Sequence, residues 1–235
     1  MPGLIEQNGI IPVFSTPFDL TSLISYWKLE EASGTRVDSH STNDLTDNNT
    51  VTQSAGKLGN AGQFTAANSE YLSHADNAAL SVADIDFAFT VWIYADSWPL
   101  FPIIIRKGDA GSTREYVLYH NSAADKLTWQ VSTGVPSGTV ERTGALSTAT
   151  WYFIYIEHDS VGNTLGISVN NETLTTAAYS GGSADNTGPF EIGGGSDQLL
   201  WFDGRIDSVS FWKRLLTAAE RTSLYNSGTG LEYPF

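Results

Sequence analysis

The sequence has 235 residues, of which 41% are hydrophobic and 12% aromatic, and it includes 22 glycines. This composition is typical of an ordered, turn-rich globular protein and excludes an intrinsically disordered chain. The formal net charge of −14 argues against nucleic acids and anionic membranes as partners, because their phosphates would repel the protein. A chain of this length is expected to form one domain with a sizeable core.

The sequence contains no cysteine, so no disulfide can stabilise it. Its first residues lack the basic and apolar regions of a secretory leader, and no stretch approaches the ~20 apolar residues of a membrane span. We therefore expect no membrane insertion. The protein is either made and assembled inside a cell, or it has lost a leader.

Residues 1–22 combine several prolines and glycines with an apolar content that is high for a solvated tail. Because proline disfavours a helix, these residues are predicted to form an extended N-terminal arm that docks on a surface. That surface belongs either to the arm's own domain, residues 23–235, or to a neighbouring subunit or host assembly.

The rest of the chain alternates short β-rich runs with turn signals, whereas residues 31–61 are polar and are expected to form loops with short strands at most. About a dozen strands and one terminal helix predict an all-β fold, an antiparallel sandwich or barrel. The expected strands cover residues 23–30, 62–65, 70–74, 85–95, 103–107, 114–120, 126–132, 138–143, 151–158, 164–170, 173–177, 190–193 and 205–213.

The segment 203–228 predicts a turn, the last strand and then a helix. Thr217 and Glu220 have the spacing of a capping box, and Gly228 is the expected helix stop. Within the strand, Asp207 has the alternation phase of Val209 and Phe211, so its carboxylate is predicted to point toward the core with them. A buried carboxylate then needs backbone donors, a cation or a metal as its partner.

Four stretches, in this order, resemble the laminin-G-like, concanavalin A-like β-sandwich domains, over roughly residues 23–230. The resemblance implies the jelly-roll form of the sandwich. The stretches are Leu23-Ile-Ser-Tyr-Trp27, Phe89-Thr-Val-Trp-Ile93, Thr150-Trp151-Tyr152 through Val169-Asn170-Asn171, and Gly204-x-Ile206-Asp207-x-Val209-x-Phe211-Trp212 with Thr217-x-x-Glu220.

No catalytic pattern stands out. Laminarinase-type hydrolases of this fold have a Glu-x-Asp-x-x-Glu strand, and the nearest approach is Glu157-His158-Asp159, which lacks the third acid and runs into a turn. A nucleophilic triad is not indicated, and the four histidines lie too far apart for a local zinc site. We therefore predict that the protein is not an enzyme.

Calcium is the most plausible cofactor. The loop Asp38-Ser-His-Ser-Thr-Asn43 resembles the family's opening loop, and members of the wider superfamily often hold Ca²⁺ near it. The candidate ligands are Asp38, Asn43 and Asp207, whose oxygens suit a hard cation. The alternative is that Asp38 and Asn43 form Asx turns while Asp207 accepts backbone amides.

A saccharide ligand would need aromatic side chains outside the core. Trp98 lies in a proline-bounded loop with Phe101, and Trp201 follows a glycine run, so these two tryptophans are the candidate ligand-binding residues. The alternative is that they only anchor their loops. Other aromatic residues lie inside strand patterns and are predicted to be structural: Phe89, Trp92, Trp129, Trp151, Phe153 and Phe211.

The favoured hypothesis is a lectin-like structural or adhesion protein of a virion surface, such as a bacteriophage head decoration, fibre or tail component. In it, residues 1–22 bind other structural proteins or copies of the chain in an oligomeric assembly, and surface glycans are further partners. The alternative is a carbohydrate-binding module or adhesin domain of a secreted bacterial protein. A hydrolase or lyase of the same superfamily is the third hypothesis.

Overall fold

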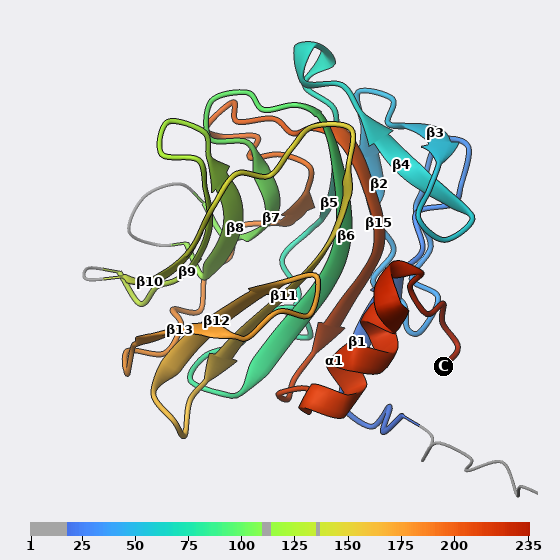
Figure 1. Cartoon of the computed structure of the whole chain (residues 1–235). Helices are drawn as coiled ribbons and strands as arrows, with labels where there is room; N and C mark the ends of the chain where they lie inside the picture. Colours follow the sequence, from blue (N-terminus) through green and yellow to red (C-terminus); the bar gives the residue numbers. More distant parts are fainter. Residues whose placement is uncertain (1–17, 110–113, 135–136) are drawn as a thin grey trace, which may run out of the picture.

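The computed structural model describes residues 18–109, 114–134 and 137–235. Within these ranges, two antiparallel sheets face each other, and a short helix follows the last strand (Figure 1). The predicted all-β, two-sheet sandwich with one C-terminal helix is therefore confirmed.

One sheet of the described chain has eight strands, with β6 and β15 at its centre. β6 is the strand predicted to be central, and both of its faces are buried along most of its length. In spatial order the strands are β13 (Thr175–Ala178), β12 (Thr164–Val169), β11 (Trp151–Asp159), β6 (Phe87–Ser97), β15 (Asp203–Trp212), β4 (Asn60–Phe64) and β3 (Thr52–Ala55), with β1 (Leu23–Trp27) also pairing with β15.

The other sheet has seven strands within the described ranges. Two of them, β2 and β14, have only three residues each. In spatial order the strands are β10 (Gly138–Thr143), β9 (Lys126–Val131), β8 (Tyr116–Asn121), β7 (Ile103–Lys107), β14 (Phe190–Ile192), β5 (Tyr71–His74) and β2 (Thr46–Asn48).

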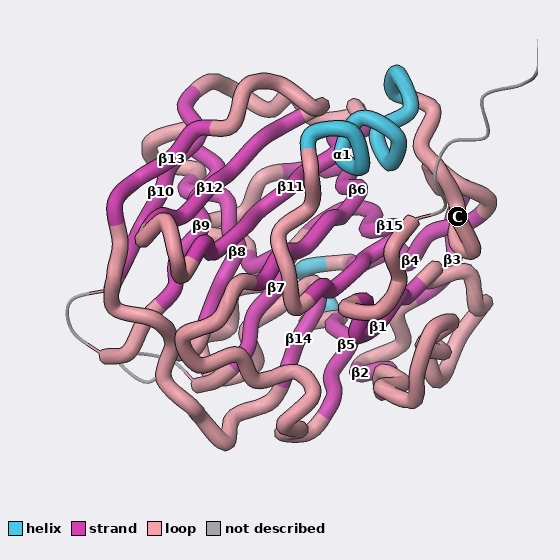
Figure 2. Tube along the Cα trace, turned by 90° about the horizontal axis from the view of Figure 1, so that it is seen from below, coloured by secondary structure: helices cyan, strands magenta, loops and turns pink. Residues whose placement is uncertain are grey.

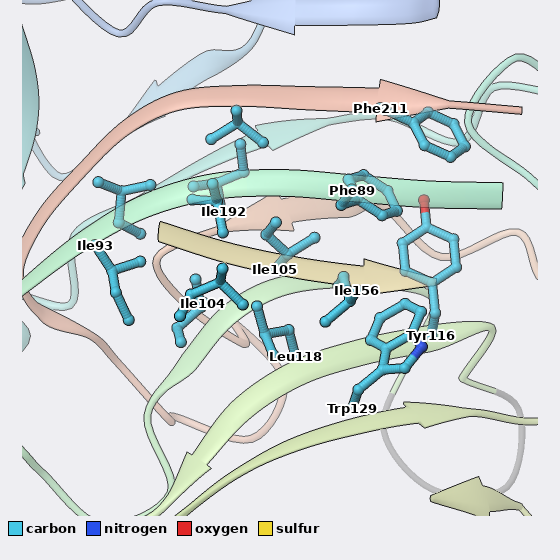
Figure 3. Close-up of a cluster of buried hydrophobic side chains, with 14 of the residues drawn as sticks. Phe89, Ile93, Ile104, Ile105, Tyr116, Leu118, Trp129, Ile156, Ile192 and Phe211 are labelled. Carbon is cyan, nitrogen blue, oxygen red and sulfur yellow. The ribbon is translucent and has the colours of Figure 1, made fainter. Parts of the chain in front are cut away.

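The main core lies between the two sheets. Phe89 and Phe211 stack at 4.4 Å between ring centroids, and Tyr116 and Trp129 reach them from the opposite sheet (Figure 3). These side chains come from alternate positions of their strands, as period-two burial predicts. The residues on the other face of each strand are therefore the ones that can meet solvent, a helix or a ligand.

A second apolar cluster lies on the outer side of the eight-stranded sheet, where α1 (Ala218–Tyr225) and the C-terminal residues cover it (Figure 2). Tyr225 of the helix contacts the rings of Trp92 and Phe153. Both were correctly predicted to be structural, but they pack under the helix rather than between the sheets.

Helix α1 begins as the sequence predicts. Thr217 is the N-cap: its hydroxyl accepts the Glu220 amide at 3.2 Å, and its own amide donates to the Glu220 carboxylate at 2.8 Å. The helix ends at Asn226, whose φ of 46° is left-handed, and not at Gly228 as expected. Asparagine tolerates this conformation better than most residues, so it serves as the C-cap. Two 3₁₀ turns, Ala66–Asn68 and Asn226–Gly228, complete the helical segments described.

The predicted orientation of Asp207 is wrong. Its neighbour Ile206 lies in the main core, and Asp207 pairs with Trp92 on the outer side of the sheet. The register with β6 shifts between Asp207 and Ser210, where Ser208 has a φ of 51°. This β-bulge inserts one residue and inverts the alternation, so Val209 returns to the core while Asp207 does not.

Most of the predicted N-terminal arm, residues 1–17, lies outside the described residues. Phe18 and Leu20 pack against the second cluster, and the ring of Phe18 lies 4.8 Å from that of Phe235. The division into an arm of residues 1–22 and a domain of residues 23–235 stays a prediction. No helix in the described ranges combines the length and apolar character needed to cross a membrane.

Candidate binding site

A pocket of about 220 Å³ lies on the outer face of the seven-stranded sheet. In β8, Tyr116 and Leu118 face the core, so the alternate residues Val117 and Tyr119 face outward into the pocket wall. Ile103, the cross-strand neighbour of Tyr119 in β7, lies beside them. The lining is completed from other segments by Phe101, Arg114, Gln198 and Leu200.

The pocket combines aromatic and apolar walls with one cation. Arg114 donates from Nη2 to the Gln198 side-chain oxygen at 2.6 Å and, more weakly, from Nη1 to that of Gln130 at 3.5 Å, and both acceptors are neutral. Burial, and then the nearby Arg106, lower the pKa of Arg114, while the charge of Asp197 acts in the opposite direction. An arginine nevertheless remains charged at neutral pH. The guanidinium can therefore attract hydroxyl or carboxylate oxygens of a ligand.

The loop 193–202 forms one side of the pocket and needs glycine to do so. Gly193 has a φ of 80°, in the left-handed region that favours glycine. A Cβ on Gly195 would lie 2.5 Å from the end of the Ile103 side chain, which would have to move to make room for it. Inside the loop, the Gly195 amide donates to the Leu200 carbonyl at 3.1 Å.

A buried ion network fixes this loop to the sheet. Arg106 of β7 donates from Nε to the Glu191 carboxylate at 2.9 Å, and it also pairs with Asp197 in the loop. Glu191 in turn accepts the Ser196 hydroxyl. The side chains of Arg106 and Glu191 are 0% and 1% exposed, so the protein shields both charges from water. Gln198 is thereby held beside the pocket.

Trp98 anchors the other loop of the pocket. Its Nε1 donates to the Leu146 carbonyl at 2.7 Å, and its ring stacks on His120 with 4.0 Å between centroids. Two residues further, the chain turns at Leu100 and brings Phe101 to the pocket, where its ring meets Tyr119 edge-on at 6.4 Å. The predicted loop therefore contributes to the site, through Phe101.

Trp201 has the same kind of role in loop 193–202. Its ring stacks on Tyr71 at 5.3 Å between centroids, and the preceding Leu200 lines the pocket. Both predicted tryptophans are half-buried, and neither is among the residues that line the pocket. Direct contact of Trp98 or Trp201 with a ligand stays a prediction, and the packing seen fits the loop-anchoring alternative.

Five lining residues were missed by sequence reasoning: Ile103, Arg114, Val117, Tyr119 and Gln198. Tyr119 could have been found, because its alternation with Leu118 marks it as an aromatic residue facing away from the core. Arg114 and Gln198 gave no local signal. They meet only because the loop after β14 crosses the start of β8, which is a long-range contact.

The family is decided by a profile comparison. The profile of the concanavalin A-like lectin/glucanases superfamily matches residues 65–220, more than half of the chain. The chain belongs to this superfamily. No match was found among curated protein sequences.

Solved structures share the superfamily fold at low identity. The binding domain of Paraclostridial mosquitocidal protein 1 has a TM-score of 0.71 and 13% identity over 88% of this chain. Domain 4 of the extracellular arabinanase AbnA from Geobacillus stearothermophilus, in complex with arabinotriose, has a TM-score of 0.65 and 12% identity over 89% of this chain and 98% of its own. A structure of botulinum neurotoxin type C, whose cell entry depends on interaction with two ganglioside molecules, has a TM-score of 0.67 and 12% identity over 88% of this chain. The chain spans 52% and 51% of the two toxin structures, about half of each.

The opening loop of this superfamily member holds Asp38 in a dense set of backbone donors. Its Oδ1 accepts the amides of Tyr26, His40 and Ser41, each at 3.0 Å, and its Oδ2 accepts that of Asn43 at 3.2 Å. The side chain of Asn43 is also engaged, because it donates to Ser25 and accepts from Asn77.

Asp207, the third candidate calcium ligand, accepts the amides of Lys57 at 2.7 Å and Leu58 at 2.9 Å, together with the Ser208 hydroxyl at 2.8 Å. These donors occupy the lone pairs that a cation would need. In the described part of the chain, no three His, Cys, Asp or Glu side chains are grouped so that they could hold a metal. The positions of Asp38, Asn43 and Asp207 in the structure therefore do not fit a calcium site. Calcium binding stays a prediction, and it is tested by comparing the melting temperature with added Ca²⁺ and with EDTA.

The two acids nearest to a hydrolase motif are also occupied. Glu157 accepts the Tyr155 hydroxyl and lies 3.8 Å from Arg221 of α1, and burial raises its pKa. Asp159, at the end of the same strand, accepts the Gly162 amide in the hairpin turn. As predicted, Asp159 lies at a hairpin end, and the helix packs beside Glu157.

Proposed function

We propose that this chain is a non-enzymatic, lectin-like domain that binds a saccharide in the pocket of Tyr119, Phe101 and Arg114. The supporting observation is the composition of that pocket. Sugars have apolar faces that pack on aromatic rings and hydroxyl groups that need directed polar partners. Tyr119 and Phe101 supply the first, and Arg114 and Gln198 supply the second.

The structural neighbours support this proposal. One is an arabinanase domain solved with arabinotriose, and another is the botulinum neurotoxin type C that interacts with gangliosides. The arabinanase domain is closer to this chain in size, because the match covers 98% of that domain and 89% of this chain. At these identities only the fold is shared, so the proposal depends on the pocket itself.

Binding without cleavage fits the positions of the acidic residues. Hydrolysis of a glycosidic bond needs two carboxyl groups facing each other across the scissile bond. Glu157 is bonded to Tyr155 and packed beside α1, and it lies on the eight-stranded sheet, away from the pocket. Among the described residues, no Asp or Glu lines the pocket.

Replacing Tyr119 by Ala should lower the affinity for the saccharide by about 5- to 30-fold, because the variant loses an aromatic wall worth ~1–2 kcal/mol. Tyr119→Phe keeps the ring and should lose less. Glycan-array screening followed by calorimetry with the best ligand, with arabinotriose as a fixed probe, measures the effect.

Val161→Ala is the control, because Val161 is 84% exposed in the hairpin between β11 and β12, on the other sheet. It should bind as the wild-type chain does. Absence of binding to any glycan, or unchanged affinity of Tyr119→Ala, would contradict the proposal.

We further propose a virion surface as the setting, with residues 1–22 as the anchor; an extracellular adhesin or carbohydrate-binding module is the alternative. Phe18 and Phe235 meet on the outer side of the eight-stranded sheet, whereas the pocket lies on the seven-stranded sheet. An anchor at residue 18 would leave the pocket facing away from the assembly.

Deleting residues 1–17 should abolish incorporation into particles but keep a folded domain. If the shortened protein is still incorporated, the virion-surface setting is excluded.

A further inference from the structure

A row of five side chains crosses the outer face of the eight-stranded sheet, beside the second apolar cluster, against which Trp151 packs. The members are cross-strand neighbours on β11, β6, β15, β4 and β3. Figure 1 shows these strands side by side, with α1 near one end of β15. In order, the row consists of Trp151, Tyr94, Arg205, Gln63 and Thr52.

The row points away from the core. Ile93 and Ile206 face the core from β6 and β15, so the adjacent Tyr94 and Arg205 lie on the opposite face. Trp151, Tyr94, Arg205 and Gln63 are half-buried and Thr52 is exposed, so all five reach solvent. Strands lie about 4.8 Å apart, and the row therefore spans roughly 19 Å.

Contacts within the row fix its side chains in place. The rings of Trp151 and Tyr94 lie 5.4 Å apart, and the Arg205 guanidinium lies 4.4 Å from the Tyr94 ring centroid. Arg205 Nε donates to the Gln63 side-chain oxygen at 3.1 Å. Ligand binding would therefore cost little side-chain entropy, as in other preorganised sites.

The chemistry of the row favours a sugar polymer over other partners. The indole and phenol rings offer apolar surface, while Gln63 and Thr52 offer neutral polar groups. Within the described residues, Arg205 forms a hydrogen bond through Nε alone, so its other nitrogens can donate to a ligand. Five side chains are far fewer than the roughly 20–30 residues that each partner contributes to a standard protein interface. The net charge of −14 disfavours nucleic acid, and the Asp96 carboxylate, which accepts from Gln63 at 2.9 Å, places a negative charge beside the row.

We propose that this row is a second saccharide-binding surface, which takes the middle of an extended, uncharged polysaccharide lying across the strands. It differs from the pocket in position and in ligand: the pocket is a hollow of about 220 Å³, which suits a chain end or a short oligosaccharide. Because the two surfaces lie on opposite sheets, one protein can bridge two glycan chains.

Native gel electrophoresis in the presence of a soluble polysaccharide tests this inference, with linear arabinan, mixed-linkage β-glucan and galactomannan as the three probes. At least one probe should retard the wild-type protein. Trp151→Ala and Arg205→Gln should each raise the dissociation constant for that probe by about tenfold. Arg205→Gln is a surface change that keeps the fold even if Trp151→Ala does not.

Val161→Ala, at a residue that is 84% exposed and belongs to neither surface, is the matched control and should be retarded like the wild type. Tyr119→Ala separates binding at the row from binding in the pocket. The proposal is wrong if no probe retards the wild-type protein, or if Arg205→Gln and a folded Trp151→Ala migrate like it. If Tyr119→Ala alone loses retardation, the polymer binds in the pocket, which overturns this inference and leaves the proposed function intact. If retardation is lost only in the row variants and no oligosaccharide binds in the pocket, this inference holds and the proposed function fails.

Discussion

Replacing Arg106 by Met should lower the free energy of unfolding by about 3–5 kcal/mol, because it leaves a buried carboxylate without its cation. Glu191 is 1% exposed and receives two donors from Arg106, so its remaining described partner in the network is Ser196. An unpaired charge in such a place costs far more than the pair contributes when it is complete.

Urea unfolding followed by circular dichroism measures the effect. The double variant Arg106→Met with Glu191→Leu should recover most of the lost stability, since it removes both charges. Lys126→Met is the control: Lys126 and Glu141 form a pair at 2.6 Å on the same sheet but are 32% and 35% exposed. Its loss should change stability by less than about 1 kcal/mol. Equal losses for Arg106→Met and Lys126→Met would contradict a buried, unpaired Glu191.

The same substitution connects stability to binding. Arg106 joins the sheet to Asp197, next to Gln198 of the pocket. Loop 193–202 should therefore become looser in Arg106→Met, and saccharide affinity should fall even at temperatures where the protein stays folded. Arg106 does not line the pocket, so it acts on binding as a positioning residue.

Local patterns explain why much of the fold could be predicted. The capping box of Thr217 and Glu220 involves residues three apart, so helix α1 began where expected. Strands such as β7 and β12 lie between turn signals and were bounded within a residue or two. In contrast, the first strand ends at Trp27 and not at residue 30, because Leu29 takes a left-handed φ of 62° that no local pattern indicates.

The candidate site was predicted only in part, and for a physical reason. Proline and glycine breakers identified the loops of Trp98 and Trp201, and both loops border the pocket. The side chains that complete it come from β7, from β8 and from Arg114, two residues before β8, and their proximity depends on strand order. Trp151 was predicted to be structural because it lies inside a strand pattern. It packs against the second apolar cluster, but it is half-buried and lies on the outer face of its sheet.

Asp207 shows how one bulge changes a prediction. Period-two alternation placed it with Val209 in the core, but the left-handed Ser208 interrupts the count. Serine, unlike glycine, does not indicate a left-handed backbone conformation, so the sequence contains no signal for the bulge. The predicted need for a partner was nevertheless correct: Lys57 and Leu58 supply the backbone donors.

Protonation of Asp207 should make stability depend on pH between about 4 and 7. Burial raises the pKa of Asp207 to about 7, against the lowering effect of the Leu58, Ser208 and Lys57 donors, and Glu30 adds a smaller rise. The unfolded chain has a pKa of about 3.9 at this residue. Between these values only the folded state holds the proton. The stabilisation is therefore complete below pH ~4 and is lost as pH rises through 7, at about 1.4 kcal/mol per unit.

Asp207→Asn removes this dependence while keeping the shape of the side chain. The amide oxygen can accept from Lys57 and Leu58, and the amide nitrogen can donate to Ser208 Oγ. We expect the variant to be more stable than the wild type at pH 8, by up to about 4 kcal/mol, and to match it near pH 4.

Urea denaturation of both proteins from pH 4 to 8 isolates the contribution of Asp207, because every other titrating group is common to the two chains. Ser208→Ala, which removes a donor that favours the charged carboxylate, should extend the decline to higher pH. A variant Asp207→Asn that is less stable than the wild type at pH 8, with the same slope, would mean that the three donors keep Asp207 ionised in the folded protein despite its burial.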